Sequence, residues 1–196
     1  GIILLCAPLM KALLNKPVNL RKELRKVIKN TGVLESNLII DAIKYANPSG
    51  LKKYKGVSNV LEKKQEEKKI HEIMLISSPW DRISKCYVDN YSEIFDFGLP
   101  FFSSLKKKIS REKAIQILYL DYASKSPDSH LLRKFGYCKA NTIMKMFKTL
   151  NLKILRNPHK DFSYQIRLLD AYLKNSNYNP GTCADLTVTT CLLYTS

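Results

Sequence analysis

The chain has 196 residues, with 33 Lys and Arg against 17 Asp and Glu, which gives a formal net charge of +16. Its 45% hydrophobic and 26% charged residues are typical of a folded domain, and they exclude a disordered tail, a collagen-like repeat and a multi-span membrane protein. A chain of this length can bury a core without disulfides or metal ions. The surplus of positive charge indicates an anionic partner.

The sequence leads us to expect a chain truncated at both ends. Residues 1–10 are an apolar run without the basic segment of a signal peptide, and Lys11 interrupts it. Because a membrane span needs roughly 20 apolar residues, we expect no membrane partner and interpret the run as a core helix whose upstream part is missing. Residues 191–196 match the translation of a common sequencing adapter. We expect them to be a scar after a domain of residues 1–190.

The five cysteines are scattered along the chain, and none forms a Cys-x-x-Cys pair. The three histidines stand at no metal-ligand spacing from them or from each other. This pattern predicts reduced cysteines in a cytoplasmic protein. A cysteine nucleophile is left open, although no pattern supports one.

Apolar residues at helical spacing predict an all-α fold, a single compact multi-helix domain. Residues 20–30 and 34–46 are the first segments after the N-terminal run, with Ser36 as the N-cap of the second and residues 47–50 as its end. Residues 51–69 are rich in lysine and predict a basic loop.

The middle of the chain predicts two longer helices. The spacing favours one helix over residues 80–97, with Ser78 as its N-cap and Pro79 at its first position. Ser110 begins the next helix. The expected buried stripe of that helix is Ala114, Ile117, Leu118 and Tyr122.

The last third of the chain continues in the same way. A short loop at residues 125–128 precedes a leucine-containing segment, and residues 140–150 and 162–173 are further helical segments. A last helix begins near Cys183. The sequence shows no convincing strand pair or β-α-β alternation.

Residues 179–187, Asn-Pro-Gly-Thr-Cys-Ala-Asp-Leu-Thr, are the most informative string. Thr182 and Asp185 have the spacing of a capping box that follows a Pro-Gly turn. Capping is the ordinary use of such a string. The N–H groups of a first helical turn also bind anions, and an acidic side chain beside them can hold Mg²⁺ against phosphates. From the residues alone, both interpretations are open.

The same string resembles the C-terminal motif of the triphosphoribosyl-dephospho-CoA synthase family. Residues 128–136, Asp-Ser-His-Leu-Leu-Arg-Lys-Phe-Gly, are similar to that family's Asp-Thr-Asn-Leu-Leu-His-Arg-Gly-Gly segment. Residues 46–51 and 80–100 are similar to its archaeal-type branch, and residues 1–5 resemble the tail of its first glycine motif. The resemblance therefore covers nearly all of residues 1–190.

Two departures from the family pattern put substrate contacts in question. Phe135 stands where the bacterial motif has glycine, and Ser129 and His130 replace threonine and asparagine. The upstream part of the family's sequence is also absent. This leaves open that the fragment is inactive by itself.

The resemblance implies a transferase that moves the triphosphoribosyl group of ATP to the 2′-hydroxyl of 3′-dephospho-CoA and releases adenine. Displacement at the anomeric carbon of a ribose needs cations around the triphosphate and a carboxylate near the developing positive charge. Asp185 and Asp128 are the candidates for catalysis and for holding Mg²⁺. The candidate substrate- and phosphate-binding residues are Asn179, Gly181, Thr182, Lys125, Arg133, Lys134 and Asp81.

Each candidate also has a structural interpretation. Asp128 follows a proline and suits a turn or an N-cap, and Asp81 suits the first turn of a helix. Arg133 and Lys134 are typical of a solvated surface. His130, a candidate general acid, is equally typical of a structural histidine.

Two other functions stand as alternatives. A basic all-α nucleic-acid-binding domain would explain the net charge, the lysines of residues 51–69 and the eleven tyrosines. The lysines are spread over every helix, however, and the sequence has no helix-turn-helix, zinc or RNA-binding motif, which disfavours nucleic acid as a partner. The second alternative is a non-catalytic helical interaction domain.

Overall fold

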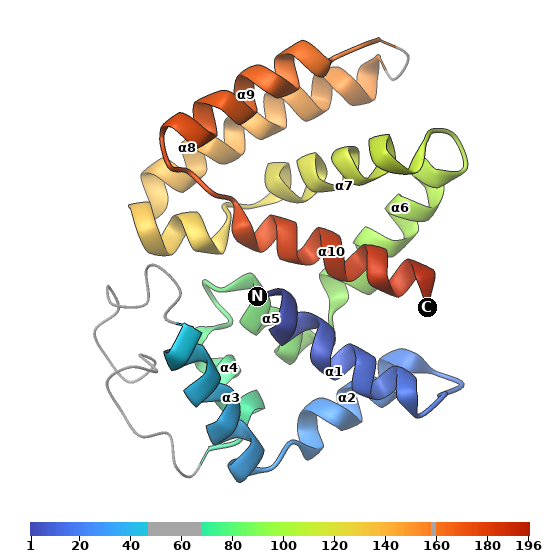
Figure 1. Cartoon of the computed structure of the whole chain (residues 1–196), viewed down its shortest axis with the longest axis vertical. Coiled ribbons are helices and arrows are strands. Elements are labelled where there is room, and N and C mark those ends of the chain that lie inside the picture. Colours follow the sequence, from blue (N-terminus) through green and yellow to red (C-terminus); the bar gives the residue numbers. More distant parts are fainter. Residues whose placement is uncertain (47–67, 158–159) are drawn as a thin grey trace.

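The computed structural model describes residues 1–46, 68–157 and 160–196. In these residues every regular element is a helix, so the prediction of an all-α fold is confirmed (Figure 1). The elements are α1 (Ile2–Leu14), α2 (Leu20–Asn30), α3 (Val33–Ala46), α4 (Ile70–Ser77), α5 (Arg82–Asp89), the π-helix η2 (Glu93–Gly98), α6 (Leu99–Lys106), α7 (Arg111–Lys125), α8 (Ser129–Arg156), α9 (Ser163–Asn175) and α10 (Gly181–Thr195).

Helix α10 runs through the middle of the molecule. It packs against α1 on one side and against α6, α7 and α8 on the other, and so it lies between the α1–α5 half and the α6–α9 half (Figure 1). The hydroxyls of Thr187, Thr189 and Thr190 each donate to the carbonyl four residues earlier at 2.8 Å. These bonds satisfy the hydroxyls inside the helix, so this threonine-rich helix can be buried on several sides.

A proline inside α1 helps to fix how α5 packs on it. Pro8 has no N–H, so the carbonyl of Leu4 loses its ordinary helical partner. The hydroxyl of Tyr87 donates to that carbonyl at 2.6 Å, and Tyr91 donates to the carbonyl of Leu5 at 3.0 Å. The two tyrosines therefore anchor the α5 region to the start of α1.

The prediction of one helix over residues 80–97 is wrong. Asn90 and Tyr91 adopt left-handed φ values of 56° and 57°, which end α5 before the chain resumes as η2. The apolar spacing looks continuous because both parts bury the same side. Periodicity does not detect two consecutive left-handed residues, which are rare outside glycine.

Three predicted caps are also corrected. Ser78 ends α4, and Asp81 caps α5 by accepting the N–H groups of Ile83 and Ser84 at 3.0 Å. Ser36 lies inside α3, where its hydroxyl donates to the carbonyl of Gly32 and accepts the N–H of Ile70. It therefore joins α3 to α4 instead of capping a helix. Thr182 is likewise no cap, because α10 begins before it at Gly181.

Other local predictions are confirmed. Ser110 caps α7, with its hydroxyl accepting the N–H of Lys113 at 3.3 Å, and the expected stripe of that helix is buried. The predicted leucine-containing segment after residue 128 and the predicted helix of residues 140–150 are the two parts of α8, which bends at Gly136. The predicted terminator at 47–50 and nearly all of the basic loop at 51–69 lie outside the described residues. None of the described helices combines the length and apolarity that crossing a bilayer requires.

Candidate active site

Three helices, α5, α8 and α10, begin at the same place in the molecule, beside the first residues of α1 (Figure 1). The N–H of Arg82 at the start of α5 donates to the hydroxyl of Ser129 at the start of α8, at 2.9 Å. Asp185, in the first turns of α10, lies with its Oδ2 3.9 Å from the α-amino nitrogen of Gly1. Because the N-terminal end of a helix is electropositive, this convergence favours a negatively charged ligand.

A cavity of about 1030 Å³ opens at this convergence. One part of its wall is polar, and the rest consists mainly of apolar side chains from α1, α3, α4 and α5. The residues of the polar end are Asp81, His130, Arg133, Asn179, Gly181, Thr182 and Asp185. The fold thus brings six of the nine sequence-predicted site residues to one cavity, and His130 with them.

The other three predicted residues do not line the cavity. Lys125 pairs with Asp121 at 3.4 Å and lies over the ring of Phe97. Lys134 extends over the ring of Phe135, with its Nζ 5.2 Å from the ring centre. Neither lysine is placed to neutralise a phosphate at the polar end of the cavity.

Asp128, the third, caps two helices at once. Its Oδ1 accepts the N–H groups of His130 and Leu131 at 2.8 and 3.2 Å, and its Oδ2 accepts the N–H of Cys183 at 2.8 Å. The residue is only 4% exposed. These contacts fix the start of α8 against the start of α10, so the geometry favours a positioning role for Asp128 over the catalytic and metal-binding roles that we expected.

The predicted capping box in α10 is therefore wrong. The helix begins at Gly181, one residue before Thr182, and Thr182 is buried inside it. Its cap comes from Asp128 on another helix, which the local spacing of Thr182 and Asp185 cannot reveal. Asp185 is thereby left without a capping role, and its side chain lines the cavity.

The carboxyl group of Asp185 is partly buried against the first residue of the chain. Burial raises its pKa above the ordinary value, and the negative charge of Asp128 adds to this effect. A Cβ at Gly1 would come within 1.7 Å of Asp185 Oδ2, so only glycine allows the backbone this close. Asp185 is thus a carboxylate in a poorly hydrated position, where a positively charged partner is favoured.

Arg133 faces Asp185 from the start of α8. Its Nη1 donates to Asp81 Oδ2, whereas its buried Nε has no hydrogen-bond partner. The residue also lines the cavity, so its positive charge favours an anionic ligand there. The Arg133–Asp81 pair also fixes the guanidinium, because Asp81 is itself held as the cap of α5.

His130 packs on Gly181, where a Cβ would come within 2.9 Å of the imidazole Nδ1. Burial and the neighbouring charge of Arg133 lower its pKa below the ordinary value. The ring is therefore neutral near pH 7, which disfavours the general-acid role considered for it.

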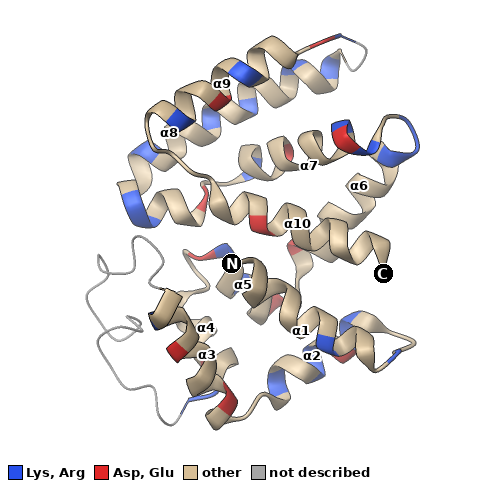
Figure 2. Ribbon diagram, viewed as in Figure 1, with Lys and Arg blue, Asp and Glu red and all other residues tan. Residues whose placement is uncertain are grey.

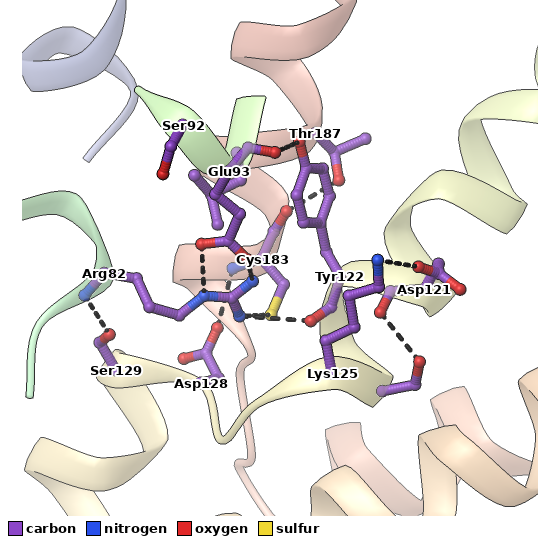
Figure 3. Close-up of polar contacts among 12 residues, drawn as sticks. Arg82, Ser92, Glu93, Asp121, Tyr122, Lys125, Asp128, Ser129, Cys183 and Thr187 are labelled. Carbon is purple, nitrogen blue, oxygen red and sulfur yellow. Dashed lines mark hydrogen bonds and ion pairs between the residues drawn. The ribbon is translucent and has the colours of Figure 1, made fainter. Parts of the chain in front are cut away.

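Sequence reasoning missed the buried network behind this site (Figure 3). Arg82 is 7% exposed, pairs with Glu93 of η2 and donates to the carbonyl of Tyr122 and the thiol of Cys183. It thereby joins α5, η2, α7 and α10. Its partners lie 11, 40 and 101 residues away along the chain, so no local sequence pattern predicts them.

Comparisons with known proteins agree with the sequence resemblance. The chain's fold is similar to the crystal structure of an Archaeoglobus fulgidus protein assigned as a triphosphoribosyl-dephospho-CoA synthase, with a TM-score of 0.77 and 23% identity over 99% of this chain and 80% of that one. At this identity the likeness shows the fold. No curated protein matches the chain in sequence.

The family comparison extends over the whole chain. The family model described as "CitG: ATP:dephospho-CoA triphosphoribosyl transferase" matches residues 1–196. This match confirms the resemblance drawn from residues 128–136 and 179–187, and it favours a transferase over the nucleic-acid-binding and interaction-domain alternatives. The chain therefore belongs to the CitG family of ATP:dephospho-CoA triphosphoribosyl transferases.

Proposed function

We propose that this chain transfers the triphosphoribosyl group of ATP to dephospho-CoA, with adenine as the leaving group, in the cavity where α5, α8 and α10 begin beside the first residues of α1. The observation that carries this proposal is the meeting of Asp185 and Arg133 at the polar end of one cavity. Family membership supports the reaction, and this geometry supports its place on the chain.

The polar end suits the triphosphate. Arg133 brings its positive charge to the wall of the cavity, and Asn179 and Thr182 line the same end at the start of α10. The N–H groups of Gly181 and Cys183 already bond to Asn179 and Asp128. Helix α10 therefore contributes mainly the positive end of its dipole.

Asp185 supplies the carboxylate that the displacement needs. In the reaction, the bond from the ribose anomeric carbon to adenine breaks with its electron pair leaving on the base, which takes up a proton from water, and a bond forms from the same carbon to the acceptor hydroxyl oxygen. The negative charge of Asp185 stabilises the positive charge that develops on the ribose, and its carboxylate accepts the proton of the acceptor hydroxyl. Its raised pKa makes it a better base than an ordinary aspartate.

We include Mg²⁺ in the proposal because the charges at the polar end do not balance a triphosphate. Arg133 is the single Lys or Arg of the described polar end, whereas a nucleoside triphosphate carries several negative charges. The described residues contain no group of three or more metal-ligating side chains. A site of one carboxylate fits Mg²⁺, which is often bound by one or two carboxylates together with substrate phosphates and water. Asp185 would hold the ion through water, which leaves its carboxylate able to accept the acceptor's proton, and the ion would neutralise phosphate charge.

The cysteines support a cytoplasmic location, which we also propose for this enzyme. All five are free thiols, and thiols persist in the reducing cytoplasm.

The test is to incubate the chain with ATP, Mg²⁺ and dephospho-CoA and to measure free adenine together with the mass of the acceptor product. We expect adenine release that requires both substrates, and an acceptor heavier by one triphosphoribosyl group. Release of adenine without dephospho-CoA would contradict the proposal. So would release of adenine while the mass of dephospho-CoA stays unchanged, or no release with both substrates present.

A further inference from the structure

We propose that the apolar part of the cavity, a trough between α1 and α3, binds the pantetheine arm of dephospho-CoA. This inference rests on the proposed function, because it assigns one of the two substrates to one part of the same cavity.

The trough leads away from the polar end along α1. Its walls include Ile3 and Ala7 of α1 on one side and Leu38 and Ala42 of α3 on the other. At the far end, Lys11 reaches across to Glu35 with 3.7 Å between Nζ and Oε1. At the helical rise, the ten residues from Gly1 to Lys11 correspond to about 15 Å. This length suits an extended chain better than a compact base.

The trough exposes apolar side chains that no other side chain of the described residues buries. Ile3 is 78% exposed and Leu38 is 63% exposed, although both line the cavity. Exposed apolar side chains gathered on facing walls indicate a surface that a ligand covers. Removing them from water would favour the binding of a partly apolar chain.

The aliphatic walls favour the arm over the adenine of ATP. A buried adenine needs hydrogen bonds along its edge, and leaving those groups unpaired is costly. The α1 and α3 walls named above are aliphatic, and the hydroxyls of Ser77 and Tyr87 elsewhere in the lining already donate to Ser84 and to the carbonyl of Leu4.

The covalent structure of dephospho-CoA matches a polar end followed by an apolar trough. Its diphosphate is joined directly to the pantetheine chain, so a diphosphate held between the triphosphate at the polar end and the start of the trough directs the arm along α1. The amides of the arm can then reach water through the open side or the polar residues of the far end. The thiol end would lie near Lys11 and Glu35.

A binding measurement tests this subsite without requiring turnover. Trp80 is the chain's single tryptophan and lines the cavity, so its fluorescence reports ligand binding. The two probes are dephospho-CoA and ADP, which is the same molecule without the pantetheine arm. We expect dephospho-CoA to bind at least about tenfold more tightly, since burying a few methylene groups accounts for such a ratio.

Two variants fill the trough from opposite walls. Ala7 and Ala42 are both exposed residues that line the cavity, so Ala7→Phe and Ala42→Phe add bulk without disturbing the core. We expect either change to raise the Kd of dephospho-CoA about tenfold and to leave the Kd of ADP unchanged. The matched control is Ala171→Phe, at an exposed position of α9 that is not among the residues lining the cavity.

The outcomes separate this inference from the proposed function. Equal affinities for ADP and dephospho-CoA, or an equal loss for both probes in the trough variants, would overturn the subsite. A loss of ATP affinity alone would place the adenine of ATP in the trough and would overturn it as well. Failure of adenine release together with a retained arm-dependent affinity would reject the reaction and leave the subsite standing.

Discussion

At the scale of single residues, the aspartates of the two family-like strings have different environments. Asp128 has both carboxylate oxygens bound to backbone N–H groups, whereas Asp185 lines the cavity. The sequence motifs singled out both. Only the packing of α8 against α10 shows that one positions the site and the other faces the ligand space.

The environment of Asp185 predicts the pH dependence of the proposed reaction. Burial raises the pKa of its carboxyl group above the ordinary 3.8, so the group takes up a proton at a higher pH than an exposed aspartate does. Since the proposed role requires the carboxylate, kcat should fall as the pH is lowered through this raised pKa. A pH–rate profile measured at saturating substrates checks this. An acid limb centred at or below 3.8 would contradict the assignment.

The double cap at Asp128 predicts a large loss of stability in Asp128→Ala. This change removes the cap of α8 and leaves the buried N–H of Cys183 unpaired, so we expect the free energy of unfolding to fall by about 2–4 kcal/mol. Urea denaturation followed by circular dichroism measures it.

The control for Asp128 is Asn19→Ala, which removes an exposed cap from α2 alone. We expect that change to cost about 1 kcal/mol. Equal losses in the two variants would show that Asp128 does not join the two helices energetically.

At the scale of elements, the π-helix η2 serves to place Glu93 opposite Arg82. The left-handed pair at Asn90 and Tyr91 ends α5, and the chain then returns with Glu93 directed at the buried guanidinium (Figure 3). Short π-helical turns frequently occur at functional sites. Here the turn lies directly behind the helix starts that form the cavity.

A double-mutant cycle tests the Arg82–Glu93 pair. Glu93→Leu leaves the guanidinium buried without its carboxylate, and we expect a loss of about 2–4 kcal/mol, reduced from the usual range because the Glu93 side chain is 22% exposed. Adding Arg82→Leu should recover part of that loss. If the two single changes add without coupling in chemical denaturation, the pair does not stabilise this junction.

Local signals were enough to predict many helices but not their junctions. The helix of residues 20–30 and the cap at Ser110 follow from apolar spacing and capping chemistry within a few residues. The sequence separated the two parts of α8 but did not place the break at Gly136, where φ is 80° and ψ is 172°. The Asp128–Cys183 cap spans 55 residues and depends on tertiary packing.

The candidate site was predictable to a similar degree. The family-like strings of residues 128–136 and 179–187 identified Arg133, Asn179 and Asp185, which the fold brings to one cavity. The apolar walls from α1 and α3 carry no motif. Their role follows only from the space between the helices.

At the scale of the whole molecule, the net charge of +16 is distributed rather than focused. In the described residues, Lys and Arg lie on helices of both halves (Figure 2). Arg133 is the single one that lines the polar end of the cavity. The charge therefore raises the local concentration of anionic substrates in general, while recognition depends on a few buried groups.

The most direct test of the central claim is the rate of adenine release from ATP and dephospho-CoA in Asp185→Asn, compared with Asp170→Asn. Asp170 is an exposed carboxylate of α9 that pairs with Lys174, so its change controls for loss of charge alone. We predict that Asp185→Asn lowers kcat by about 10²–10³-fold, as expected for the loss of a catalytic carboxylate, and that Asp170→Asn keeps the wild-type rate. Wild-type turnover in Asp185→Asn would contradict the assignment of this cavity as the active site.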